Sequence, residues 1–453
     1  MLILLPILFL SLVLTLLFLG FNLVNAVDSE KSLPTVRDPE LKLDLIYEGN
    51  FERGRNQISP ISTMTFLGKD IVILSKNDGR VNIITNGTLV NEPLLDVSVA
   101  NKRERGLLGV TSSRAEENSI QYVFLYYTES RNKDGSDICD TNRSCRSGTE
   151  PVGNMLYRYE KVGNKLINPK LLLNLPAFPA PGHNGGAISI GPDNNLYLTI
   201  GDIVGWANKS SSTTVQNIDN GTKPDGRAGI LRITQDGKTV SGGILDKQFP
   251  LNLYYAYGIR NSFGIDFDPV TGNLWDTENG PDYGDEINLV KPGFNSGWGD
   301  VQGIWEPIVS TSPTAQDRVA GKEFLNYKDL VNFGGKGKYS SPEFIWKNPV
   351  GATDLIFFNS DKLGDEYKND LFVGCVNLGV IFHFKLNKDR TELALAGNLK
   401  DKIADKPDEL DQVIFGEGFD SITDLDIGPD GNLYVLTYKG KDVKIYKIMS
   451  KVT

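Results

Sequence analysis

The chain has 453 residues, of which 40% are hydrophobic and 23% are charged, so it is long enough for one large folded unit or for two to three smaller ones. Its formal net charge is −10, and acidic and basic residues are mixed along the sequence. This balance argues against a nucleic acid or an anionic membrane surface as the partner. The 47 glycines and 22 prolines favour an architecture with many tight turns.

The chain begins with an apolar segment. Residues 2–19 are nearly all apolar, and the small-residue pattern of a signal-peptidase site follows at Val24-Asn25-Ala26. We therefore expect export to the extracellular space or the cell surface, with residues 1–26 as a signal peptide or as a membrane anchor. Both alternatives stay open, because the segment is long enough to span a bilayer and lacks the usual positively charged start. Residues 27–40 are polar and predict a linker.

Short alternating or β-branched segments recur between residues 41 and 450, without a sustained helical period. Radial packing of small sheets would cover faces that no single sheet could bury, so we predict an all-β, six-bladed β-propeller with four-stranded antiparallel blades. Two stacked sandwiches are the alternative. Residues 41–49 are expected to pair with residues 441–448 and close the ring. The recurring units lie at 68–84, 119–130, 191–202, 268–280, 368–386 and 428–448.

The three cysteines agree with export. Cys139 and Cys145 bracket a short polar loop, where a disulfide would tie a hairpin tip, and Cys375 lies in an apolar strand-like segment. We expect the first two to form a disulfide and the third to be buried. A metal site at the pair is excluded by the lack of further thiols and nearby histidines.

One of the two histidines, His183, lies in the small-residue loop PAPGHNGG at 179–186. The following hairpin ends in Asp202, so the two side chains could lie near each other. A histidine beside a carboxylate is a general base with its orienting partner. The alternative is a histidine that only satisfies a loop hydrogen bond.

Further chemistry is concentrated some sixty residues later in the chain. Arg260 and Asn261 follow a glycine at a strand end, where a guanidinium and an amide can meet an oxyanion or a quinone oxygen. The segment 278–281 and the pair Asp285 and Glu286 supply carboxylates and backbone carbonyls, which are the ligands that calcium prefers. The alternative is a solvated acidic loop.

Five motifs resemble, in the same order, those of the glucose/sorbosone dehydrogenase family, which are soluble quinoproteins that use pyrroloquinoline quinone (PQQ) on a six-bladed propeller. The motifs are RGLLGV, GHNGGAISIGPDNNLYLTIGD, GIRNSFGIDFDP, LWDTENGP and GDEINLVKPGFNSGW. The resemblance covers residues 45–448. It implies these roles: His183 as catalytic base, Asp202 as its partner, Arg260 and Asn261 facing the quinone, Glu104 at the position before GLLG, Gly280 and Pro281 as ligands of the quinone-activating calcium, and Asp285 and Glu286 at a structural calcium site.

The chain departs from the family pattern where the cofactor carboxylates are usually met by a lysine and by arginines. Asn377, Ser421 and Thr423 stand at those positions, so three cations are lost, and Phe263 replaces a residue that is often polar. Each charge-assisted contact contributes about 1.5–3 kcal/mol to binding, so a tricarboxylate cofactor should bind more weakly without these cations. Either the cofactor is held differently, at Asn377 among other residues, or this branch kept the fold and dropped the quinone.

These observations predict PQQ- and calcium-dependent oxidation of a sugar or polyol hydroxyl by hydride transfer, with His183 as the base and an unknown final electron acceptor. A non-catalytic extracellular propeller that binds a carbohydrate or a protein is the first alternative. The second is a calcium-dependent hydrolase on the same fold, with Glu104 or Asp202 near the metal.

Overall fold

The computed structural model describes residues 33–51, 59–114, 120–132, 150–178, 180–203, 213–303 and 330–452. Residues Thr35–Thr453 form one compact unit. The described part is mostly β, with short 3₁₀ helices at Thr214–Gln216, Leu251–Leu253, Gly397–Asp401 and Pro407–Gln412.

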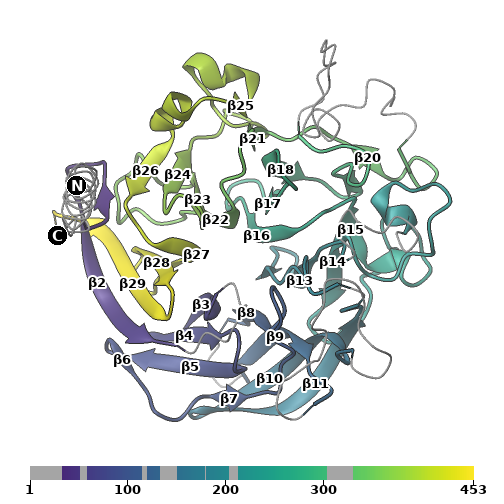
Figure 1. The fold of residues 1–453 in the computed structure, drawn as a ribbon, viewed down its shortest axis with the longest axis horizontal. Helices are drawn as coiled ribbons and strands as arrows, with labels where there is room; N and C mark the ends of the chain where they lie inside the picture. Colours follow the sequence, from purple (N-terminus) through teal and green to yellow (C-terminus); the bar gives the residue numbers. More distant parts are fainter. Residues whose placement is uncertain are drawn as a thin grey trace, which may run out of the picture. The chain divides into compact units, whose positions relative to one another are not determined.

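The strands form six sheets around a common centre (Figure 1). The first sheet contains β3 (Ile61–Leu67), β4 (Asp70–Ser75), β5 (Arg80–Thr85), β6 (Thr88–Leu89) and β7 (Leu95–Asp96). The second contains β8 (Leu107–Ser112), β9 (Tyr122–Glu129), β10 (Gly153–Val162) and β11 (Lys165–Leu175). The third contains β12 (Ile188–Ile190), β13 (Asn195–Ile200), β14 (Gly229–Thr234), β15 (Tyr254–Tyr257), β19 (Phe294–Asn295) and β20 (Lys338–Tyr339).

The remaining sheets complete the circle. The fourth contains β16 (Ser262–Phe267), β17 (Leu274–Glu278), β18 (Asp285–Val290), β21 (Phe344–Trp346) and β25 (Ile403–Ala404). The fifth contains β22 (Ala352–Phe357), β23 (Leu371–Cys375), β24 (Ile381–Phe384), β26 (Ile414–Glu417) and β1 (Thr35–Val36). The sixth contains β27 (Ser421–Ile427), β28 (Leu433–Lys439), β29 (Asp442–Ser450) and β2 (Leu41–Asn50).

The innermost strands define the centre of the ring. β3, β8, β12, β16, β22 and β27 contact one another in this order, and β27 contacts β3 again. This is the arrangement of a β-propeller, in which the sheets pack face to face like blades. The prediction of four-stranded antiparallel blades is wrong for four of the six sheets, which have five or six strands. The reason is that short segments of the connections add to sheet edges, in part through the parallel pairs β15–β19, β19–β20 and β21–β25.

Apolar side chains fill the space between neighbouring sheets. Trp275 of β17 and Trp346 of β21 are no more than 1% exposed, and they contact Phe357 of β22 and Phe344 at ring-centroid distances of 6.3 and 5.0 Å respectively. Cys375 is buried in the same core and is a free thiol, as predicted. Close packing between the sheets keeps the inner strands in fixed positions.

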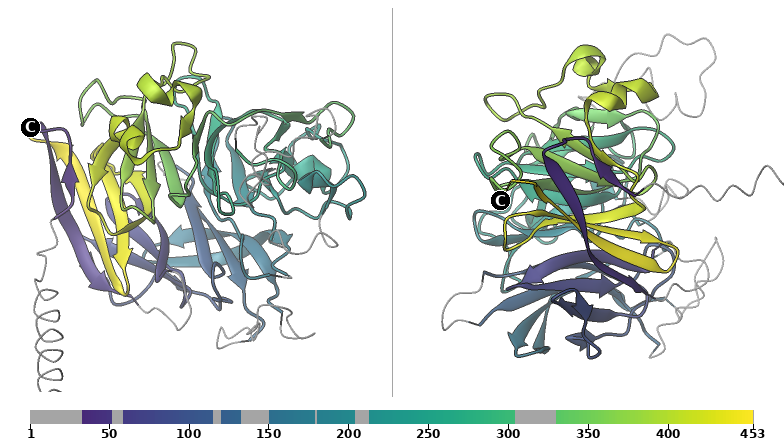
Figure 2. Two further views of the ribbon diagram at one scale, coloured as in Figure 1. Left: turned by 45° about the horizontal axis from the view of Figure 1, so that its top comes forward. Right: turned by 90° about the vertical axis from the view of Figure 1, so that its left-hand side faces the viewer.

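The ring closes as predicted from the sequence. β2 pairs antiparallel with β29 from Leu41 opposite Ser450 to Asn50 opposite Asp442, and the two strands lie side by side in both views (Figure 2). Residues 35 and 36, inside the predicted linker, form β1 and pair with β26. The predicted signal peptide or anchor at 1–26 and the predicted disulfide of Cys139 and Cys145 lie outside the described residues. No helix in the described part of the chain is long and apolar enough to cross a membrane.

Candidate active site

His183 lies in the loop before β12, where its imidazole meets Asp202. Its Nδ1 is 2.6 Å from Asp202 Oδ1, and the indole Nε1 of Trp298 donates to Asp202 Oδ2 over 2.8 Å. The Asp202 side chain is 1% exposed and that of His183 is 13% exposed. Because a carboxylate only accepts hydrogen bonds, it places the imidazole proton on Nδ1 and leaves Nε2 as the basic nitrogen.

The backbone around His183 packs closely against the segment of Arg260. His183 has a φ of +61°, in the left-handed region that costs a non-glycine residue about 1 kcal/mol or more. A Cβ on Gly201 would lie 2.9 Å from His183 Cβ and 2.6 Å from the carbonyl oxygen of Arg260. Glycine at this position therefore lets the His183 loop and the Arg260 segment pack together at the end of β13.

Arg260 is held between carboxylates and a carbonyl. Its backbone N–H donates to Glu278 Oε1 over 2.6 Å, and its Nη1 donates to the carbonyl oxygen of Asn279 over 2.7 Å. Its carbonyl accepts the backbone N–H of Asp202 over 2.9 Å, and its guanidinium lies 5.4 Å from the ring centroid of Trp298. Burial lowers the pKa of Arg260, and the charge of Asp202 opposes this effect.

Glu104 connects the loop of His183 to the segment of Arg260 and Asn261. Its Oε2 accepts the backbone N–H of His183 over 2.5 Å and the Asn261 side-chain amide over 3.2 Å. Lys76 was not among the predicted site residues, and its Nζ donates to the Arg103 carbonyl over 2.6 Å. Burial lowers the pKa of Lys76 to about 8, and the charge of Glu104 opposes this effect. A lysine at the end of an apolar strand is the signal that could have revealed it.

The segment after β17 lies beside this cluster. Asp285 Oδ1 accepts the Gly280 N–H over 3.0 Å, and Oδ2 accepts the Gly351 N–H over 2.7 Å, which ties the loop to the next sheet. Glu286 is buried, and its Oε1 accepts the Gln302 amide over 2.8 Å. Among the described residues, no group of three or more His, Cys, Asp or Glu side chains is arranged to hold a metal ion. The structural calcium site at Asp285 and Glu286 therefore stays a prediction.

Hydrogen bonds join most of the predicted site residues, whereas the one printed for Asn377 leads to none of them. His183, Asp202, Arg260, Asn261 and Glu104 are joined by the hydrogen bonds above, and the Arg260 guanidinium reaches the segment before Gly280 and Pro281. Asn377 is exposed and donates to the Pro349 carbonyl over 3.3 Å.

A cavity of about 710 Å³ opens beside the cluster, with Glu104, Asn279 and Phe263 in its wall. Its other walls come from the innermost strands β3, β8, β12, β16, β22 and β27. Four acidic residues that line it were not among the predicted site residues: Asp266, Asp354, Asp424 and Asp426. Asp424 and Asp426 alternate along β27, a pattern that by itself indicates a solvent-facing side of a strand.

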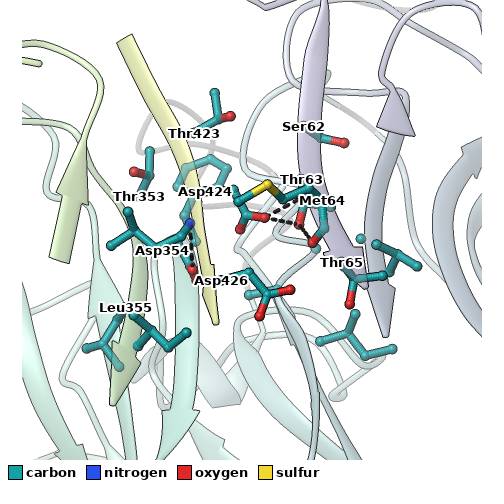
Figure 3. A pocket seen from close by; sticks show the side chains of 18 of the residues that line it. Ser62, Thr63, Met64, Thr65, Thr353, Asp354, Leu355, Thr423, Asp424 and Asp426 are labelled. Carbon is teal, nitrogen blue, oxygen red and sulfur yellow. Dashed lines mark hydrogen bonds between the residues drawn. The ribbon is translucent and has the colours of Figure 1, made fainter. Parts of the chain in front are cut away.

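These aspartates are fixed by hydrogen bonds and have raised pKa values. Asp424 Oδ2 accepts the Met64 N–H over 2.7 Å and the Thr63 hydroxyl over 2.9 Å, so it connects the last sheet to the first (Figure 3). Burial raises the pKa of Asp266 and that of Asp426 to about 7. Burial also raises the pKa of Asp354 and Asp424 well above the usual range, and neighbouring carboxylates add to this effect.

The fold and the site define a propeller with a histidine–carboxylate pair beside a central cavity. The glucose/sorbosone dehydrogenase family model matches residues 59–447, and the chain belongs to this family. It is 26% identical over 268 residues to aldose sugar dehydrogenase YliI of Escherichia coli, covering 58% of this chain and 59% of that protein. It is also 26% identical over 315 residues to quinoprotein glucose dehydrogenase B of Acinetobacter calcoaceticus, covering 58% of this chain and 64% of that protein.

These two matches span less than two thirds of either curated relative. Among solved structures, the apo form of the soluble aldose sugar dehydrogenase of Escherichia coli has a TM-score of 0.66 and 20% identity. That comparison covers 91% of this chain and 100% of the other, and it confirms the propeller fold.

The described residues around His183 offer partners to a quinone and to calcium, whereas the cavity wall offers few to the carboxylates of PQQ. Near His183, Arg260 Nε and Asn261 Oδ1 are buried and have no hydrogen-bond partner among the described residues, which suits a polar ligand. The segment of Gly280 and Pro281 supplies backbone oxygens of the kind that calcium prefers, and the bond from the Gly280 N–H to Asp285 Oδ1 holds it in place. In the described part of its wall, the cavity offers one ammonium group, that of Lys76, to the three carboxylates of PQQ. The tricarboxylate therefore does not fit this cavity as a whole.

Proposed function

We propose that the protein oxidises a hydroxyl group of a neutral sugar or polyol to a carbonyl, with His183 as the general base and a quinone-class acceptor for the hydride. The observation that carries the proposal is the 2.6 Å contact between His183 Nδ1 and Asp202 Oδ1 beside Arg260. The activities named for the two curated relatives, aldose sugar dehydrogenase and quinoprotein glucose dehydrogenase, support it. In this proposal each of the six sheets is one blade, and the protein is exported.

Each residue has a defined role in the proton transfer. His183 Nε2 accepts the hydroxyl proton while the carbon loses a hydride, so that formation of the C=O bond removes two electrons and two protons from the substrate. Asp202, held by Trp298, fixes the tautomer and stabilises the imidazolium. Arg260 stabilises the negative charge that develops on the substrate oxygen. Glu104 positions the His183 backbone and the Asn261 amide.

The Gly280 and Pro281 carbonyls are the proposed calcium ligands, since calcium prefers oxygen ligands in flexible geometry. Asp285 would hold them in place through its hydrogen bond to the Gly280 N–H. The bound calcium would polarise the acceptor, and a redox cofactor carries the electron chemistry that no side chain supplies.

The test is an oxidation assay of the purified protein with calcium, a quinone, an artificial electron acceptor and a panel of aldoses and polyols. His183→Gln should lower turnover by about 10²–10⁴-fold, the usual contribution of a positioned base. His383→Gln is the matched control, because His383 also contacts an aspartate, at 2.8 Å from Asp370, but packs between Phe372 and Tyr367 in the core. Full turnover of the His183 variant would remove this residue from the mechanism.

A further inference from the structure

We propose that Lys76 is a positioning residue of the site: its ammonium group holds residues 103–106, here called the Glu104 turn, in the place from which Glu104 fixes His183 and Asn261. The inference rests on the proposed function in one respect, which is that His183 acts as the base. The contacts that carry it do not depend on the reaction.

The backbone of Lys76 is fixed on both sides. Lys76 follows β4 directly, and only 5% of the residue is exposed. Its N–H donates to the carbonyl oxygen of Pro60 over 3.0 Å, and its own carbonyl oxygen accepts the N–H of Leu107, the first residue of β8, over 2.9 Å. Lys76 therefore lies at the junction of the first two sheets and gives its side chain a firm base.

The Glu104 turn packs directly against Lys76. The Nζ of Lys76 donates to the carbonyl oxygen of Arg103 over 2.6 Å. A Cβ on Gly106 would lie 2.2 Å from the Lys76 carbonyl oxygen and 2.8 Å from Lys76 Cγ, so the turn lies against both the backbone and the side chain. Arg103 has a φ of +53°, in the left-handed region that is unfavourable for a non-glycine residue. A turn with such strain persists only where surrounding contacts fix it, and the ammonium group supplies one of them.

The other side of the Glu104 turn contacts the site. Glu104 Oε2 accepts the backbone N–H of His183 over 2.5 Å and the side-chain amide of Asn261 over 3.2 Å. The guanidinium of Arg105, which is fully buried, donates to the carbonyl oxygen of Ala177 in the segment that leads to His183. A displacement of the turn would therefore move the backbone that carries the base and the amide beside it.

The strength of this support depends on the charge of Lys76. An ammonium group donates a stronger hydrogen bond than a neutral amine, and it also attracts the carboxylate of Glu104. Among the described residues, Glu104 is the ionisable group whose charge acts on Lys76, and it opposes the burial that lowers the pKa of Lys76 to about 8. The lysine is thus charged below about pH 8 and loses its proton above it. Support for the Glu104 turn should weaken over the same range.

The first test needs no turnover. The chain has two histidines, so isotope-labelled histidine rings give two sets of NMR signals, which His183→Gln assigns. In the unchanged protein, a pH titration should show an inflection at about pH 8 in the His183 signals and none in those of His383. The inflection should disappear in Lys76→Met and in Lys76→Arg, because a guanidinium stays charged. Lys161→Met is the matched control, since Lys161 also donates to a backbone carbonyl, that of Gly163 over 3.4 Å, and it should keep the inflection.

The second test uses the oxidation assay to separate positioning from ligand binding. Below about pH 8, Lys76→Met should lower kcat about 10-fold with little change in KM, because a misplaced base slows the reaction without removing a ligand contact. The unchanged protein should fall toward the kcat of Lys76→Met above about pH 8. Lys76→Arg should keep a high kcat on both sides of this pH, and Lys161→Met should follow the unchanged protein.

The proposal is overturned if the His183 signals of the unchanged protein show no inflection at about pH 8, if Lys76→Met keeps full kcat, or if it changes KM alone. If Lys76→Met fails to fold, the titrations of the unchanged protein and of Lys76→Arg decide the question. If the protein oxidises none of the sugars and polyols, the proposed function fails, whereas the NMR titration still decides whether Lys76 supports the His183 loop.

Discussion

Asp426→Asn should make the stability of the protein less dependent on pH. Burial raises the pKa of Asp426 from 3.8 to about 7, so the folded protein keeps a proton that the unfolded chain releases between these two values. The resulting stabilisation is complete below about pH 4, falls as the pH rises, and is lost above about pH 7. A pKa rise of this size corresponds to about 4 kcal/mol. Screening at the cavity wall reduces the expected effect to about 1–3 kcal/mol.

The replacement is nearly isosteric, and an asparagine Oδ1 can still accept the Ile427 N–H. Urea unfolding followed by tryptophan fluorescence at about pH 5 and about pH 8 gives the free energy of unfolding of each form. The unchanged protein should lose about 1–3 kcal/mol more between these pH values than Asp426→Asn does. The exposed Asp442→Asn should follow the unchanged protein. If the three forms show parallel pH profiles, the carboxyl group of Asp426 is ionised in the folded protein, which would contradict its raised pKa.

Other substitutions test the site and the fold. Trp298→Phe removes the donor to Asp202 Oδ2, and we expect about a 10-fold loss of kcat with little change in KM in steady-state assays, together with about 1–2 kcal/mol lower stability. Trp346→Ala should cost about 3–5 kcal/mol in chemical denaturation, because this side chain is 1% exposed. Gly185→Ala should be much more destabilising than Gly440→Ala in thermal melts: both have positive φ, but a Cβ at 185 would lie 2.4 Å from a backbone oxygen, whereas that at 440 meets nothing within 4 Å.

The sequence was most informative where partners lie in ordered local motifs. The hairpin that separates His183 from Asp202 was readable, and the segment at 41–49 was a recognisable strand with an obvious partner at the other end of the chain. Trp298 was missed because it contacts Asp202 from 96 residues further on, and a tryptophan gives no signal of which carboxylate it will meet. The aspartates of β27 were missed because their environment depends on β3, some 360 residues earlier in the chain.

The extra strands at the sheet edges were also missed because no local motif indicates their pairing. Pairs such as β19–β20 contain only two residues each, too few for a periodic pattern. Their pairing depends on the path of the connecting segments, which local propensity does not determine. The consequence is that the ring and its centre were predictable, whereas the outer edges and the charge of the cavity wall required the structure.

The pairing of β2 with β29 has a consequence for biosynthesis. The backbone N–H of Lys451 donates to the carbonyl of Glu40 over 2.8 Å, so the two ends of the ring meet only when almost the whole polypeptide exists. At about 5–20 residues per second, β2 waits on the order of 20–80 s after leaving the ribosome before its partner emerges. During that interval its edge is open to foreign strands, and the exposed charges of Lys42, Asp44 and Glu48 along it discourage such pairing.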